Sequence, residues 1–285
     1  MVNKIIRFLK SLMIFLMFVV LFSAIFMVIS FLKSNNKDDK PSNDEFLFLL
    51  AGVDSTGEDT GTRTDTLMLI KADSANSTIN IVSIPRDSYV SIRGSMDKIN
   101  AAHSYGGIDL TMDTVRNLMG IKLDNYMVIS FDAVVAGIDA LGGMDVDINE
   151  NVAKAMGYKP GIHKFMGKEV LKFVRFRKGY QNADIGRIGT QQAFMKQFIK
   201  EVTKTKNIPK LPSIYKAMKP YIKTNISMGQ MTKLAFEFKS VNQDDIKSYK
   251  IDGQAFMQNG ISYYKLNDSS IEEIRNNVLN NFLVN

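Results

Sequence analysis

The chain has 285 residues, with 36 lysines and arginines against 29 acidic residues, and its formal net charge is +7. It contains no cysteine and two histidines, which excludes disulfides and thiolate metal sites and argues against a histidine-based zinc site or a Ser-His-Asp triad. Four basic residues and no acidic residue fall within 1–33, so only +3 remains for the rest, too small an excess for a nucleic-acid-binding protein.

An apolar run without any charged residue covers 11–32. As a helix it would extend about 33 Å, enough to cross the hydrocarbon layer of a bilayer. Three basic residues precede it, so the positive-inside rule makes 1–10 a cytoplasmic tail and exports the rest. A cleaved signal peptide is the alternative, although the run is long for one and no cleavage site stands out. We therefore predict a single-pass protein of the cell membrane, with a polar tether at 33–44 and an extracellular domain at 45–285.

The exported part reads as strands interleaved with helices. A continuous apolar run at Phe46–Val53 predicts a central strand covered on both faces, and Thr66–Lys71 and Ile79–Ile84 predict a hairpin. The alternation predicts an α/β fold, a three-layer α/β/α sandwich around a mixed central sheet. Further extended segments are expected at Tyr126–Ile129 and Val146–Ile148, and helices at Leu110–Met119, Asp132–Leu141 (stopped by Gly142-Gly143), Glu169–Val174, Arg187–Thr203, Ile214–Met218, Met228–Phe238 and Ser269–Phe282 (capped by Asp268).

The predicted hairpin brings charged residues together. With its turn centred on the polar segment between the strands, Asp65 lies opposite Pro85, which places Arg63 and Asp65 beside Arg86. Asp54 follows the first strand at its carboxyl end, the edge where α/β sheets bind ligands. We therefore expect these four charged residues to share one rim.

Lysines outnumber arginines three to one, yet five of the nine arginines fall in three short motifs, T-R-T-D-T, S-I-P-R-D and V-R-F-R-K-G-Y-Q-N-A-D-I-G-R. Arginine can hold a phosphate or a carboxylate with two parallel hydrogen bonds. Five such groups favour an anionic ligand with several oxygens, and the alternative is that each pairs with a neighbouring aspartate. The five are Arg63, Arg86, Arg175, Arg177 and Arg187.

The third motif supplies several of the predicted anion contacts. Extended backbone at R-F-R would point Arg175 and Arg177 to one face. Arg187 is expected to open a helix, where the helix dipole disfavours a cation unless an anion binds the same terminus. Gln191, one turn further on, would donate a hydrogen bond to that anion. An ion pair between Arg187 and Asp184 is the competing explanation.

Asp54 and Asp65 have no histidine or cysteine nearby, which favours a hard cation, magnesium or alternatively manganese, bound by one or two carboxylates and by substrate phosphates. The alternative is that Asp65 and Asp87 cap turns or pair with Arg63 and Arg86.

Three further features of the sequence each allow a structural or a functional interpretation. Lys98 either joins the rim or is a surface lysine, and His103 is expected to make a local hydrogen bond. The segment 154–178 holds eight lysines and arginines and one acidic residue, which indicates a solvated face or a dock for a polyanionic polymer.

Taken together, G-V-D-S, T-R-T-D-T-L-M-L, S-I-P-R-D, K-I-N-A-A-H, V-R-F-R and D-I-G-R-I-G-T-Q-Q make the chain resemble the LytR-CpsA-Psr family of membrane-anchored enzymes of Gram-positive cell envelopes. The resemblance is close from Phe46 to Phe198. It implies a phosphotransferase that moves an anionic glycopolymer, wall teichoic acid or capsular polysaccharide, from polyprenyl pyrophosphate to peptidoglycan through a phosphodiester, while polyprenyl phosphate leaves. Hydrolysis of the pyrophosphate is the side activity we would expect.

The resemblance also implies roles for residues. Asp54 and Asp65 would hold magnesium against the pyrophosphate, and an apolar tunnel beside the sheet would take the lipid. The chemistry of the residues themselves, and not the resemblance, makes Asp65 or Asp87 the candidate general base, and Asp87 is favoured because a metal-bound carboxylate is a poorer base. Thr190 stands where many members carry an arginine. The absence of that arginine here would weaken phosphate binding without abolishing the reaction. The residues around the phosphates would be Arg63, Arg86, Arg175, Arg177, Arg187 and Gln191, with Arg86 and Arg177 catalytic. Lys98, which the resemblance does not supply, is a further candidate for phosphate binding.

Two other functions compete with the phosphotransferase. A non-catalytic protein that binds polyprenyl lipids or polyanions and acts in envelope regulation is the alternative. A transcriptional regulator is disfavoured because the predicted topology exports the domain and no helix-turn-helix spacing is visible.

Overall fold

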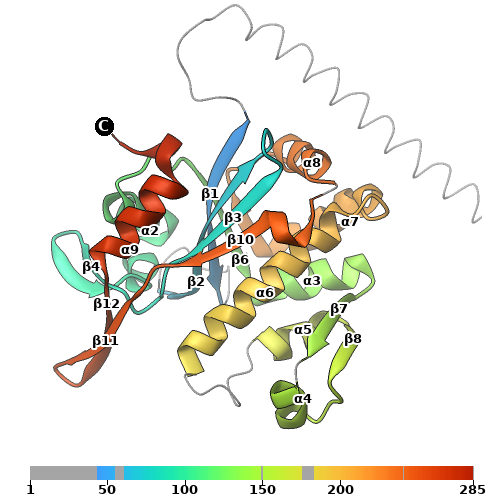
Figure 1. Cartoon of the computed structure of the whole chain (residues 1–285), viewed down its shortest axis with the longest axis horizontal. Coiled ribbons are helices and arrows are strands. Elements are labelled where there is room, and N and C mark those ends of the chain that lie inside the picture. Colours follow the sequence, from blue (N-terminus) through green and yellow to red (C-terminus); the bar gives the residue numbers. More distant parts are fainter. Residues whose placement is uncertain (1–43, 55–60, 149, 175–182, 240, 285) are drawn as a thin grey trace, which may run out of the picture. The chain divides into compact units, whose positions relative to one another are not determined.

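The computed structural model describes residues 44–54, 61–148, 150–174, 183–239 and 241–284 (Figure 1). Within these ranges no helix is both long and apolar enough to cross a bilayer. The expected cytoplasmic tail, the membrane helix at 11–32 and nearly all of the tether lie outside the described residues, so they stay predictions.

A six-stranded mixed sheet runs through the described part of the chain, in the order β10-β3-β2-β1-β6-β9. The apolar strand β1 (Glu45–Val53) lies inside it, antiparallel to β2 and parallel to β6. The predicted hairpin is present as β2 and β3. The other strands of this sheet are β2 (Thr64–Asp73), β3 (Thr78–Ser83), β6 (Asn125–Ser130), β9 (Ile222–Thr224) and β10 (Ile246–Lys250).

Both faces of the sheet are buried by helices, which explains the unbroken apolar run of β1. Leu47 and Leu49 pack into a core cluster with residues of α2 and α9, whereas Leu50 packs on the opposite face, against residues of α6 and α8. Figure 1 shows these helices on the two sides of the sheet. The mixed sheet with flanking helices confirms the predicted α/β class. The helices are α2 (Ala101–Met119), α3 (Phe131–Leu141), α4 (Glu150–Met156), α5 (Gly167–Val174), α6 (Ala183–Thr203), α7 (Leu211–Met218), α8 (Met228–Glu237) and α9 (Asp268–Asn277).

Three two-stranded sheets, which have no counterpart among the expected strands except β7, surround the main one. Two of them, β4–β5 and β11–β12, lie near the start of α2 and contact each other through β4 and β12. The third packs with α3, α5 and α7 in a separate core cluster. The strands are β4 (Tyr89–Ile92), β5 (Ser95–Lys98), β7 (Met144–Ile148), β8 (Gly161–Phe165), β11 (Gly253–Gln258) and β12 (Ile261–Leu266), and the 3-10 turns are η1 (Ile208–Lys210), η2 (Lys219–Tyr221), η3 (Gln243–Asp245) and η4 (Asn280–Phe282).

Helix boundaries test several expectations. Gly142, with φ of 85°, ends α3 as predicted. Asn267, not Asp268, occupies the N-cap position of α9. Helix α6 begins at Ala183, so Arg187 lies in its second turn instead of opening it. The prediction that Arg187 sits at the positive end of the helix dipole was therefore wrong, because Gly186 is tolerated inside a helix that longer-range packing stabilises.

Candidate active site

The site lies where β1 ends and β2 begins, with Asp54 directly after β1 and Asp65 as the second residue of β2. Strand pairing shifts between Gly52, which faces Thr66, and Val53, which faces Thr64, so Asp65 is the extra residue of a β-bulge. Bulges re-aim side chains and are frequent beside active sites. Asp54 follows directly as an exposed residue, whereas Asp65 is half-buried.

The hairpin register differs by one residue from the expected one. Met68 pairs with Ser83, and this register continued places Asp65 opposite Arg86 and not opposite Pro85. The side chains meet accordingly, with Arg86 Nη1 donating to Asp65 Oδ1 at 2.6 Å. The expected proximity of Asp65 and Arg86 is thus confirmed.

Four charged groups form a continuous chain across this edge. Beyond the Asp65–Arg86 pair, Arg86 Nε lies 3.6 Å from Asp87 Oδ2, and Lys98 Nζ donates to Asp87 Oδ1 at 2.8 Å. Their side chains are only 18–28% exposed. Arg86 therefore does pair with neighbouring aspartates, which was one of the two alternatives that the sequence left open. Lys98 belongs to the rim and is not an isolated surface lysine. Partly buried pairs of this kind also fix the direction of each charged group toward a ligand.

Backbone hydrogen bonds fasten the segments that carry these charges. Asn100 N donates to the carbonyl of Arg86 at 3.2 Å, and the carbonyl of Asn100 accepts from Thr64 N at 3.4 Å. Buried His103 places Nδ1 2.8 Å from the carbonyl oxygen of Thr62, as expected of a local hydrogen-bonding residue. These contacts hold exposed Arg63 at the same edge, where it makes no ion pair with any described residue.

Two polar atoms at this edge are buried without a hydrogen-bond partner among the described residues, Thr64 Oγ1 and Asn100 Oδ1. Such atoms are costly in a folded protein and mark places that a ligand or water can satisfy. The sequence offered no signal for them beyond their place in the T-R-T-D-T and K-I-N motifs.

Nothing in the sequence indicated, either, that Tyr105 lies beside the row of charged side chains Asp65, Arg86, Asp87 and Lys98. Tyr105 donates from its hydroxyl to Asp97 Oδ2 at 2.6 Å. That hydrogen bond, together with the negative charge of Asp97, raises the pKa of Tyr105 above its ordinary value, and the positive charge of Arg63 acts in the opposite direction. The hydroxyl therefore stays protonated as a donor at neutral pH.

Four of the predicted phosphate contacts cannot be placed. Arg175 and Arg177 lie outside the described residues, as do the side chains of Arg187 and Gln191, although α6 contains both positions. The neighbouring Gln192 is described, and its Nε2 donates to Ser83 Oγ at 2.9 Å and to the carbonyl of Tyr249 at 2.8 Å. Gln192 thus ties α6 to β3 and β10 at the end of the sheet that carries the site.

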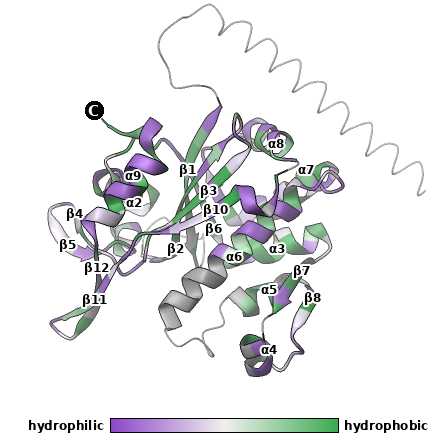
Figure 2. Cartoon of the chain, viewed as in Figure 1, coloured by the Kyte–Doolittle hydropathy of each residue, from purple (hydrophilic) through white to green (hydrophobic). Residues whose placement is uncertain are grey.

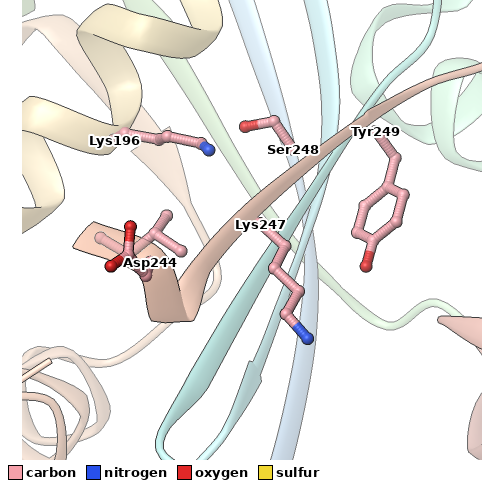
Figure 3. A pocket seen from close by; sticks show the side chains of 6 residues that line it. Lys196, Asp244, Lys247, Ser248 and Tyr249 are labelled. Carbon is pink, nitrogen blue, oxygen red and sulfur yellow. The ribbon is translucent and has the colours of Figure 1, made fainter. Parts of the chain in front are cut away.

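An open pocket of about 510 Å³ lies between α6 and β10 (Figure 3). In Figure 3 Lys196 and Ser248 point toward one another, whereas Lys247 and Tyr249 point to the other side of the strand. Asp244 and Ile246 complete the lining. This mainly polar lining differs from the apolar tunnel that the resemblance implies.

The aspartates at the rim suit a divalent cation only in a particular way. No group of three or more His, Cys, Asp or Glu that could hold a metal is present among the described residues. Magnesium, however, is commonly bound by one or two carboxylates and completes its shell with water and substrate phosphates. Asp54 and Asp65, at the ends of neighbouring strands, fit that mode and not an all-protein cage.

Known proteins resemble the chain over most of its length. A family model described as the LytR_cpsA_psr family matches residues 28–280. The polyisoprenyl-teichoic acid–peptidoglycan teichoic acid transferases TagU of Bacillus licheniformis and Bacillus subtilis are each 31% identical over 250 residues, which is 85% of this chain and 80% of theirs.

Solved structures agree with this match. The structure described as TagT bound to LI-WTA is 27% identical, with a TM-score of 0.72 over 86% of this chain and 94% of that one. Bacillus subtilis TagV is 28% identical, with a TM-score of 0.73 over 85% and 98%. Since the family model spans nearly the whole described domain and the TagU relatives are 31% identical over most of the chain, the chain belongs to the LytR-CpsA-Psr family.

Proposed function

We propose that the protein transfers an anionic glycopolymer, of the teichoic acid or capsular polysaccharide class, from polyprenyl pyrophosphate to peptidoglycan. The observation that carries the proposal is the chain Asp65–Arg86–Asp87–Lys98 at the carboxyl end of β1, with Arg63 beside it. The naming of its TagU relatives as teichoic acid transferases supports the same reaction.

The chemistry follows from what these groups can do. A sugar hydroxyl of peptidoglycan attacks the phosphorus that carries the glycopolymer, and a new P–O bond forms. The bond from this phosphorus to the bridging oxygen breaks, and polyprenyl monophosphate leaves. Arg63 and Arg86 stabilise negative charge on the phosphate oxygens. The proton of the hydroxyl passes to the Asp87 carboxylate, which Lys98 orients by its hydrogen bond at 2.8 Å.

Magnesium belongs to the proposal. Asp54 and Asp65 would hold the cation, which would neutralise charge on the pyrophosphate when bound. Asp87 is favoured over Asp65 as the general base. Asp65 accepts a hydrogen bond from Arg86 at 2.6 Å and would also bind the metal, and both interactions would make its carboxylate a weaker base. Pyrophosphate hydrolysis would follow if water replaced the sugar hydroxyl.

Location is part of the same proposal. The apolar run 11–32 would anchor the chain in the cell membrane, with the described domain outside, where both peptidoglycan and the lipid-linked polymer are accessible.

The experiment combines the full-length chain in detergent with a lipid-pyrophosphate-linked glycopolymer, peptidoglycan and magnesium. We expect polyprenyl monophosphate and covalently linked polymer to appear together, and chelation of magnesium to stop both. Donor binding without any linkage product, for every envelope polymer of the host, would instead identify a non-catalytic lipid or polyanion binder.

A further inference from the structure

Aromatic side chains gather beside the charged chain, on β4, α2 and the β11–β12 hairpin. The Tyr263 ring lies 4.8 Å from that of Tyr89 and 5.7 Å from that of Phe256, between ring centroids. Tyr89 and Phe256 are 5.4 Å apart in an edge-on arrangement. Tyr105 lies at the border, where Tyr263 adds to the rise in its pKa. We call these four residues the aromatic surface.

The aromatic surface is continuous with the candidate active site. Lys98 Nζ, which binds Asp87, lies 5.6 Å from the centroid of the Tyr263 ring. The next residue, Tyr264, donates its backbone N–H to the carbonyl of Asp87 at 2.9 Å. A hairpin about 175 positions further along the chain is therefore fastened to the proposed base itself.

Several large apolar side chains in this region are exposed to solvent. Of the nine large hydrophobic residues that are exposed in the described part, three lie here: Met96 (49%), Tyr105 (52%) and Ile261 (48%). The hairpin projects from the main sheet in Figure 1 and carries hydrophobic (green) segments in Figure 2. Exposed apolar groups that cluster in this way mark a binding surface.

We propose that the aromatic surface binds the sugar rings of the acceptor glycan, so that the attacking hydroxyl reaches Asp87. This inference rests on the proposed function. Sugar rings present C–H faces that pack on aromatic rings, and hydroxyls at their edges that bind polar groups. Tyrosines supply both an apolar ring and a polar end. Asp97 and Lys98 lie at the border of the surface, where they can form hydrogen bonds with the sugar hydroxyls.

Charge distinguishes the acceptor glycan from other occupants. Asp87 and Asp97 border the surface, so a polyanionic donor polymer would be repelled there, whereas uncharged sugar rings would not. Arg86, which suits a phosphate, pairs with Asp65 on the other side of Asp87. A lipid chain would remove water from the charged groups of Asp97 and Lys98, which costs free energy even though both are hydrogen-bonded.

The test measures transfer by the full-length chain with soluble, uncrosslinked glycan strands as acceptor. Tyr105→Ala and Tyr263→Ala should each raise the acceptor KM about 10-fold, which corresponds to the loss of one favourable aromatic contact. The donor KM should not change. Tyr105→Phe keeps the ring and should restore most of the acceptor affinity. Phe236→Ala, which removes an aromatic residue exposed to 38% on α8, is the matched control and should leave both constants unchanged.

Calorimetric binding of the same glycan strands, without donor, separates this inference from the proposed function. Glycan binding that Tyr105→Ala weakens, in a protein that performs no transfer, would support the surface and refute the transferase. Transfer with an unchanged acceptor KM in both alanine variants would overturn the inference and leave the transferase standing. Loss of binding to vesicles of anionic phospholipid in these variants, with glycan binding intact, would also overturn it by identifying a membrane contact.

Discussion

At the scale of single residues, the site depends on alternating charges that orient one another. Arg86 lies between two carboxylates, and Asp87 lies between a guanidinium and an ammonium group. Side chains that are only about a quarter exposed keep these directions better than surface pairs, which contribute little to stability. Substitutions here should therefore affect activity more than folding.

Arg86→Ala is the first prediction at this scale. Loss of one donor to the phosphate oxygens should lower kcat by about 10²-fold or more. Arg86→Lys should recover little, because an ammonium group cannot reproduce the two parallel hydrogen bonds of a guanidinium. Steady-state release of polyprenyl monophosphate measures both variants, and turnover near that of the wild type in Arg86→Ala would remove this residue from the phosphate site.

Asp54→Ala addresses the metal. With one of two carboxylates lost, the magnesium concentration that gives half-maximal transfer should rise about 10-fold or more, in line with the effect of altered metal environments. Asp109→Ala, at an exposed position of α2, is the control with the same loss of charge. Equal magnesium dependence in the two variants would contradict a role for Asp54 in metal binding.

At the scale of secondary-structure elements, α6 and the β11–β12 hairpin are joined to the site edge by specific contacts. Gln192 connects α6 to β3 and β10, and Tyr264 connects β12 to Asp87. The bulge at Asp65 likewise acts on a whole strand end, since it turns the first residues of β2 relative to the last residues of β1. These contacts hold secondary-structure elements in place at the site edge, and the residues that make them take no part in the proposed reaction.

Gln192→Ala tests the α6 contact. Two hydrogen bonds disappear, so the free energy of unfolding should fall by about 1–3 kcal/mol. Gln197→Ala, one turn and a half further along the same helix, removes an equal side chain for which no hydrogen bond is present among the described residues. Urea unfolding compares the two, and an equal, small loss in both would show that the Gln192 bonds do not stabilise the helix position.

At the scale of the whole molecule, one sheet separates two apolar layers. Leu49 lies fully buried in the layer with α2 and α9, while Leu50, its neighbour, contributes to the layer with α6 and α8. The site edge thus stands at the end of strands whose two faces are both covered, which limits movement of Asp54 and Asp65 relative to each other.

Leu49→Ala should therefore lower the free energy of unfolding by about 2–5 kcal/mol, from lost burial and the remaining cavity. Ile162→Ala, at a side chain exposed to 74% on β8, should change it by less than about 0.5 kcal/mol. Thermal or urea unfolding of the two variants provides the comparison, and similar losses would place Leu49 outside the core.

Much of this organisation could be predicted without coordinates because it depends on neighbours in sequence. The apolar run of β1, the hairpin of β2 and β3 and the glycine that ends α3 all follow from local patterns. The charged motifs likewise predicted that Asp65 and Arg86 lie side by side. The short strands β4, β5, β11 and β12 were missed because mixed polar and apolar residues over four to six positions give no clear period.

The sequence by itself determined the fold class, the family resemblance and the gathering of acidic and basic groups at one edge of the sheet. Only the tertiary structure decided the bulge at Asp65, the one-residue shift that faces it toward Arg86, the ion pair of Lys98 with Asp87 and the approach of Tyr263 to Lys98. The reason is physical. Periodicity and motifs record which side of an element a residue occupies, whereas register and contacts between distant segments result from the packing of both partners and leave no mark in either segment alone.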